Sequence, residues 1–92
     1  LARAWVPGRK KTSWHSVAVH ECYLIESGHG LVELDYQTGF NVSAGDNVSI
    51  LPHTPQRICN TGDQELVFLC LCAPRFTPEG YQLLEGTSIN SG

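Results

Sequence analysis

The stretch ECYLIESGHGLVEL, from Glu21 to Leu34, shows how this chain is built. Apolar residues alternate with other residues up to Glu26, a Ser-Gly-His-Gly segment interrupts them, and alternation resumes over residues 31–36. Successive residues of a β-strand point to opposite faces, so Glu21, Tyr23 and Ile25 share one face. The pattern predicts a hairpin whose strands, residues 21–26 and 31–36, meet at a turn over residues 27–30. Glu21 then stands where an apolar residue would have continued the pattern.

The rest of the chain shows the same short strands and turns, without a helical period of useful length. We expect an edge strand and a loop within residues 1–13, strands at 13–19, 40–42, 48–51, 56–59 and 66–73, a turn or single helical turn at 77–84, and a frayed end at 85–92. This spacing is typical of a β-sandwich or a small closed barrel. Without an internal repeat or a linker, residues 1–92 are predicted to form one domain, with its core at about residues 8–85 and peripheral ends.

Composition excludes several classes of protein. With 41% hydrophobic and 16% charged residues, the chain has the balance of a folded domain and not of a disordered one. Its net charge is −3, and residues 9–11 (RKK) form its only basic run, so no nucleic-acid partner is expected. No apolar run approaches the roughly 20 residues that a membrane-spanning helix needs.

The four cysteines, Cys22, Cys59, Cys70 and Cys72, form no C-x-x-C pair and no zinc-like spacing with histidine. On a strand, Cys70 and Cys72 share a face, and we expect all four to be free thiols. Free thiols, together with no visible signal peptide, predict a cytoplasmic protein. The chain starts at Leu1 and contains no Met, which is consistent with a trimmed natural N-terminus.

Residues 45–60 resemble the second motif of the cupins, G-x5-P-x-G-x2-H-x3-N. Gly45 and Asn60 keep the spacing, and Pro52 stands one residue late, as in a common variant of the motif. His53 replaces the turn glycine of the family, and Gln56 replaces its metal-binding histidine.

The first cupin motif, G-x5-H-x-H-x3,4-E-x6-G, is also partly present. Glu21 and Gly28 keep its second half, and His15 fits its first histidine. Val17 occupies the place of the second histidine, and Gly8 lies one residue too far upstream.

The resemblance covers about residues 8–85, including a tail (LVFLCLCAPRFTPEGYQLLE) that is similar to the last strand and extension of small single-domain cupins. It implies an all-β fold, a small jelly-roll β-barrel with a short C-terminal extension. It does not imply one function, because cupins include oxygenases, decarboxylases, isomerases, sugar sensors and storage proteins.

In the family, the first-motif glutamate binds a divalent metal together with three histidines. The resemblance therefore implies a metal set of His15, Glu21 and Gln56, with Val17 unable to contribute. An amide oxygen is a weak ligand compared with imidazole, so the expected metal (Fe, Mn, Ni or Zn) would be weakly held. A complete site would favour a metal-dependent enzyme of the dioxygenase or decarboxylase type. The other histidines, His20, His29 and His53, are expected at the surface.

A metal-free barrel is the alternative, since an inward carboxylate is costly unless it is paired, metal-bound or protonated. Hydrogen bonds from Gln56, His15 or Tyr23 would satisfy Glu21 and leave a polar pocket for a small molecule. We expect this pocket to be lined by Trp14 (or Trp5), Tyr23, Gln56 and Phe68.

The same residues permit acid–base chemistry, with His15 and Glu21 as the catalytic pair of a metal-independent isomerase or cyclase. A purely structural interpretation, in which Glu21 pairs with Arg57, is disfavoured because Arg57 should face away from Gln56. Small-molecule binding in the barrel is our leading prediction, and enzymatic activity is left open.

A homodimer is expected, because small single-domain cupins commonly pair through their sheets and a chain of this size leaves a sheet edge exposed. Trp5 and Val6, in an N-terminal strand with little local partner, are the residues expected to be buried by a second copy.

Overall fold

The computed structural model describes residues 1–73 and 81–84, which form two antiparallel β-sheets facing each other. The strands are β1 (Ala2–Val6), β2 (His15–Val17), β3 (His20–Ser27), β4 (His29–Leu34), β5 (Phe40–Ser43), β6 (Asn47–Ile50), β7 (Gln56–Asn60), β8 (Leu66–Ala73) and β9 (Tyr81–Leu83).

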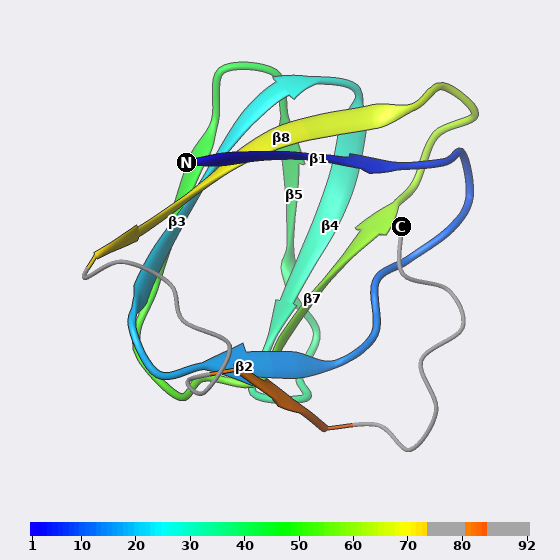
Figure 1. Cartoon of the computed structure of the whole chain (residues 1–92). Coiled ribbons are helices and arrows are strands. Elements are labelled where there is room, and N and C mark those ends of the chain that lie inside the picture. The colour runs from blue at the N-terminus through cyan, green and yellow to red at the C-terminus, as the bar shows by residue number, and fades with distance from the viewer. Residues whose placement is uncertain (74–80, 85–92) are drawn as a thin grey trace.

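One sheet has four strands in the order β1-β8-β3-β6, and the other has five in the order β5-β4-β7-β2-β9. In Figure 1, β1 and β8 run side by side across the top of the molecule, while β2 and the orange β9 lie together at the bottom. Sequence neighbours often lie in different sheets, so the chain crosses repeatedly between them. This arrangement confirms the predicted all-β, jelly-roll fold.

The predicted strands are present, and β8 has the bounds expected for residues 66–73. No described residue is helical, and within residues 1–73 and 81–84 there is no helix that could span a membrane. The turn expected at residues 77–84 lies partly outside the described residues, and its described part contains the strand β9. The frayed end expected at residues 85–92 lies wholly outside them.

The predicted hairpin of residues 21–36 is wrong. β3 pairs with β6 and β8, whereas β4 pairs with β5 and β7. Gly28 lies between the two strands with φ +92°, a conformation that glycine adopts without a steric penalty. The segment is therefore a corner that carries the chain from one sheet to the other, and His29 belongs to β4 instead of a turn.

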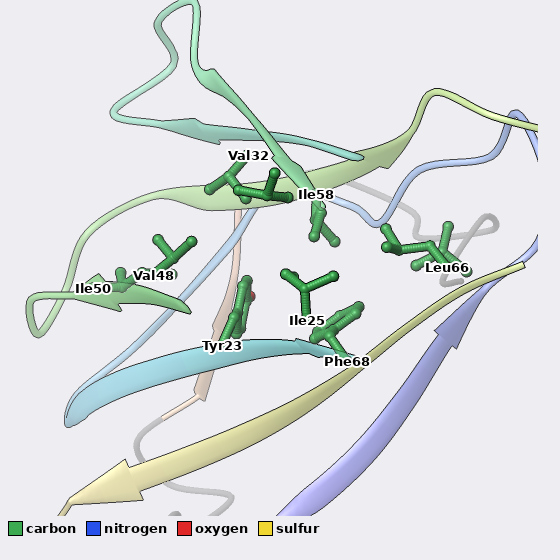
Figure 2. Close-up of a cluster of buried hydrophobic side chains, with 10 residues drawn as sticks. Tyr23, Ile25, Val32, Val48, Ile50, Ile58, Leu66 and Phe68 are labelled. Carbon is green, nitrogen blue, oxygen red and sulfur yellow. The ribbon is translucent and has the colours of Figure 1, made fainter. Parts of the chain in front are cut away.

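The space between the sheets is filled by apolar side chains. Figure 2 shows Tyr23, Ile25 and Phe68 extending from β3 and β8 toward Val32 and Ile58 on the opposite sheet. The ring centroids of Tyr23 and Phe68 are 4.9 Å apart in a tilted arrangement. Alternation along β3 buries Glu21, Tyr23 and Ile25, as the sequence pattern predicted.

The N-terminal strand is an edge strand, but it does not lack a partner. β1 pairs with β8 along its whole length, and Val6 is fully buried in the core of this chain. Val6 is therefore unavailable to a second copy, whereas Trp5 on the opposite face is 48% exposed. The homodimer stays a prediction.

The corner at Gly28 can be tested by Gly28→Ala. An added Cβ would lie 2.8 Å from the carbonyl oxygen of Glu65, and a left-handed backbone costs an L-residue about 1–2 kcal/mol. We expect the free energy of unfolding, measured by urea titration, to fall by at least that amount.

Gly62→Ala is the matched control, because the nearest atom to its added Cβ is 3.7 Å away. The free energy of unfolding of Gly62→Ala should differ from that of wild type by less than about 0.5 kcal/mol. Equal effects of the two substitutions would contradict the corner's dependence on glycine.

Candidate functional site

Three strands bring His15, Glu21 and Gln56 toward one another. His15 lies opposite Gln56 in the register of β2 and β7, and Glu21 projects from β3 of the other sheet. Gln56 and the charge of His15 both act on the Glu21 carboxyl and lower its pKa. The residues that the sequence singled out therefore do converge between the two sheets.

Gln56 is fully buried, and one hydrogen bond fixes its side chain. The hydroxyl of Tyr23, from the opposite sheet, donates to Gln56 Oε1. Burial keeps this hydroxyl protonated, because it raises the pKa of Tyr23 well above its usual value. With its oxygen engaged, the amide turns its nitrogen toward the remaining part of the site.

Glu21 is also buried, with 7% of its surface exposed. Loss of hydration raises the pKa of its carboxyl, and the Gln56 amide and the charge of His15 oppose this shift only in part. Within the described part of the chain, Glu21 Oε1 and Gln56 Nε2 are buried without a hydrogen-bond partner. The amide is near enough to the carboxyl to lower its pKa, but the two groups do not meet in the geometry of a hydrogen bond, so neither atom satisfies the other. Such orphaned groups are uncommon in folded proteins and call for an occupant or a role.

One ring nitrogen of His15 has a defined partner. Its Nδ1 lies 2.7 Å from the carbonyl oxygen of Ser13, which can only accept, so Nδ1 carries a hydrogen. In the neutral ring, Nε2 is then the basic atom. The ring of Tyr81 on β9 stacks on this imidazole, with centroids 5.7 Å apart.

Two cysteines that sequence reasoning treated only as packing residues also belong to this region. Cys70 lies opposite Tyr23, and Cys72 lies opposite Glu21, in the register of β3 and β8. Burial raises the pKa of the Cys70 thiol to about 12, and the pKa of Cys72 is also raised by burial. Both are therefore protonated and weakly polar. Strand alternation had placed them on one face, but only the pairing of β3 with β8 shows that this face meets Glu21.

Of the predicted pocket residues, Phe68 packs on Tyr23 in the core. Trp14 does not join them. Its ring lies under the guanidinium of Arg57, 4.7 Å from Cζ, and its centroid is 4.6 Å from that of Tyr36. Because Arg57 alternates with the inward Gln56, this aromatic group lies on the outer side of the sheet.

The alternative pairing of Glu21 with Arg57 is wrong, as strand parity indicated. Arg57 Nε instead donates to Glu33 Oε1 at 2.6 Å. The remaining histidines lie at the surface as expected: His20, His29 and His53 are all exposed. The ring of His20 bonds Ser49.

A hollow of about 240 Å³ lies elsewhere on the surface. It is lined by His29, Gly30, Asn41, Val42, Ser43 and Thr61. None of the predicted site residues contributes to it, so it is not the predicted pocket.

The donor atoms do not fit a metal centre of the usual kind. Among residues 1–73 and 81–84, no three His, Cys, Asp or Glu side chains are grouped so that they could hold a metal ion. The amide oxygen of Gln56 would have to complete the set with His15 and Glu21, but it accepts the hydrogen of Tyr23. Catalytic zinc sites have three protein ligands, and structural sites have four. No chemical step is therefore assigned to a metal here.

Replacing Glu21 by Gln should stabilise the protein more at high pH than at low pH. Because the folded-state pKa is raised above the usual 4.5, the contribution of Glu21 to folding is fully present below that value. It is lost as the pH rises through the folded-state pKa. The free energy of unfolding of Glu21→Gln relative to wild type should therefore increase from about pH 4 to about pH 8, as measured by urea titration.

Glu33→Gln provides a control of opposite sign. The hydrogen bond from Arg57 holds the pKa of Glu33 below its usual value, so the contribution of Glu33 is present above 4.5 and is lost as the pH falls. Relative to wild type, this variant should lose stability as the pH rises. The claim that Glu21 is a buried, unpaired carboxyl would be contradicted by either of two results. The free energy of unfolding of Glu21→Gln relative to wild type could be independent of pH, or it could fall as the pH rises, as expected for Glu33→Gln.

Comparison with known proteins agrees with the fold. The Cupin domain family matches residues 4–72. An uncharacterized protein of Methanocaldococcus jannaschii is 40% identical over 86 residues, which cover 92% of this chain and 68% of that protein.

Solved structures share the fold. An uncharacterized conserved protein of Klebsiella pneumoniae with a double-stranded β-helix domain has a TM-score of 0.80 at 18% identity, with 91% of this chain and 72% of that chain covered. A predicted oxalate decarboxylase of Thermotoga maritima has a TM-score of 0.69 at 25% identity, with 76% and 61% covered. A mutant of Bacillus subtilis oxalate decarboxylase has a TM-score of 0.77 at 22% identity, with 89% and 22% covered. Because the Cupin domain family matches residues 4–72, which are most of its length, the chain belongs to the cupin family.

Proposed function

We propose that this cupin binds a small polar molecule between its sheets, through His15, Glu21 and Gln56. The observation that carries the proposal is the buried pair of atoms without partners, Glu21 Oε1 and Gln56 Nε2. A buried group without a partner costs about 1–3 kcal/mol. A ligand that satisfies both atoms recovers this energy on binding.

The chemistry of the two atoms defines what a ligand must offer. Gln56 Nε2 can only donate, and an oxygen of the Glu21 carboxyl that carries no hydrogen can only accept. A hydroxyl group accepts from the first and donates to the second, and a second hydroxyl or an amine could donate to His15 Nε2. We therefore infer that the ligand carries hydroxyl groups, as sugars and hydroxy acids do.

Proton transfer on the bound molecule is a second candidate function, favoured by the orientation of His15. The bond from Nδ1 to the carbonyl of Ser13 leaves Nε2 as the basic atom, and the Glu21 carboxyl with its raised pKa lies nearby. A basic nitrogen beside a carboxyl group that can take up or release a proton is the pair that isomerisation of a small molecule requires.

A decarboxylase activity like that named for two of the structural neighbours is not favoured by the site. Their identities of 25% and 22% accompany a shared fold, and this chain spans 61% and 22% of their lengths. A metal-dependent enzyme would also need a third ligand, which the described residues do not offer around Glu21.

Ligand binding can be tested by thermal unfolding of metal-free protein with sugars, sugar alcohols and hydroxy acids. A ligand at about ten times its Kd adds about 1.4 kcal/mol to the stability. For a domain of this size, that energy raises Tm by several degrees. We expect at least one such compound to stabilise wild type and to lose its effect on Glu21→Gln.

The matched control is Glu33→Gln, which changes a carboxylate on the outer side of β4. It should keep the ligand-induced rise in Tm. The proposal fails if no compound stabilises wild type, or if every stabilising compound acts equally on Glu21→Gln.

Proton transfer has a separate readout. A stabilising compound incubated with the protein in D₂O should exchange a C–H hydrogen for deuterium, as followed by ¹H NMR. His15→Gln should reduce the exchange rate by about 10²-fold or more, the usual contribution of a general base. Exchange at the same rate with wild type and with His15→Gln would exclude this second function and leave binding alone.

A further inference from the structure

We propose that the Tyr23 hydroxyl is a positioning group that turns the Gln56 amide nitrogen into the site and thereby closes the site to divalent metal ions. This inference concerns the selectivity of the site and stands whether or not the proposed ligand is found. It assigns to Tyr23, a residue of the aromatic core, a role beyond packing.

The first step of the argument is the orientation of the amide. Tyr23 donates to Gln56 Oε1, so Nε2 is directed elsewhere. The opposite orientation would bring the amide oxygen toward the Glu21 carboxylate, and two acceptor oxygens repel each other. The hydroxyl and the carboxylate therefore select the same orientation from opposite sides.

The second step is the rigidity of Tyr23 itself. Its side chain is 2% exposed, and its ring packs against Phe68 at 4.9 Å between centroids. A phenol ring has few rotamers, so packing of the ring also fixes the hydroxyl. Gln56 is fully buried opposite it, which leaves the amide little space for another rotamer.

The third step is the consequence for a cation. An amide nitrogen has no lone pair to offer a metal, and its hydrogens repel a positive charge. The site then presents His15 and Glu21 as ligands and a donor group where a third ligand would be needed. Two ligands are fewer than the three that catalytic zinc and iron(II) sites take from the protein.

Mn²⁺ and Zn²⁺ titrations, by isothermal calorimetry on protein first dialysed against EDTA, test the inference. Wild type should bind either ion no more tightly than Glu21→Gln does. Replacing Gln56 by His and Tyr23 by Phe together should add a free imidazole to His15 and Glu21, the two-histidine, one-carboxylate set of iron(II) enzymes. This double variant should bind Zn²⁺ at least about tenfold more tightly than wild type.

The single variant Tyr23→Phe isolates the role of Tyr23. Without the hydroxyl, the amide oxygen of Gln56 is released and can serve as a third ligand beside His15 and Glu21, so this variant should bind Zn²⁺ more tightly than wild type does. Equal affinities of Tyr23→Phe and wild type would show that Tyr23 does not control the orientation of residue 56. Far-UV circular dichroism of each variant checks that it is folded.

The claim that the site excludes divalent metal ions can be tested by titration of wild type and Glu21→Gln, even if the other variants do not fold. Micromolar binding of Mn²⁺ or Zn²⁺ that is lost in Glu21→Gln would overturn the inference. That result would not by itself remove the proposed small-molecule function, because the ligand screen is carried out on metal-free protein.

Discussion

The hydrogen bond from Tyr23 to Gln56 joins the two sheets inside the barrel, and the candidate site depends on it. An amide that is fully buried without a partner would cost about 1–3 kcal/mol, so Gln56 is tolerated because Tyr23 satisfies its oxygen. The same bond leaves the amide nitrogen on the side of the Glu21 carboxyl, whose pKa is raised by burial. The apolar core and the polar site are therefore one structure, with Tyr23 belonging to both.

Local patterns in the sequence were sufficient for the existence of most strands and for the faces of the residues along β3 and β7. Alternation along β3 placed Glu21 and Tyr23 inward, and parity along β7 placed Arg57 outward, away from Gln56. These predictions succeeded because strand geometry depends only on neighbouring residues. That His15, Glu21 and Gln56 form one site was predicted from the resemblance to the cupin motifs. Strand alternation alone does not predict it, because it does not say which distant strands lie close together.

What could not be predicted depends on pairing between distant strands. The segment of residues 21–34 has the composition of a hairpin, yet a jelly roll places its two strands in different sheets. Cys70 and Cys72 join the site only through the register of β8 with β3, and Tyr81 joins through that of β9 with β2. Trp14 was expected in the pocket, but packing against Arg57 places it outside.

The most direct test of this account is the titration of the Glu21 side-chain carboxyl by ¹³C NMR in metal-free wild-type protein. The account predicts a pKa above the usual glutamate value, because burial outweighs the stabilisation from Gln56 and His15. A pKa at or below that value would contradict it, since the carboxylate would then be ion-paired, fully hydrogen-bonded or hydrated. In that case Gln56 and Tyr23 would not form the selective site described above.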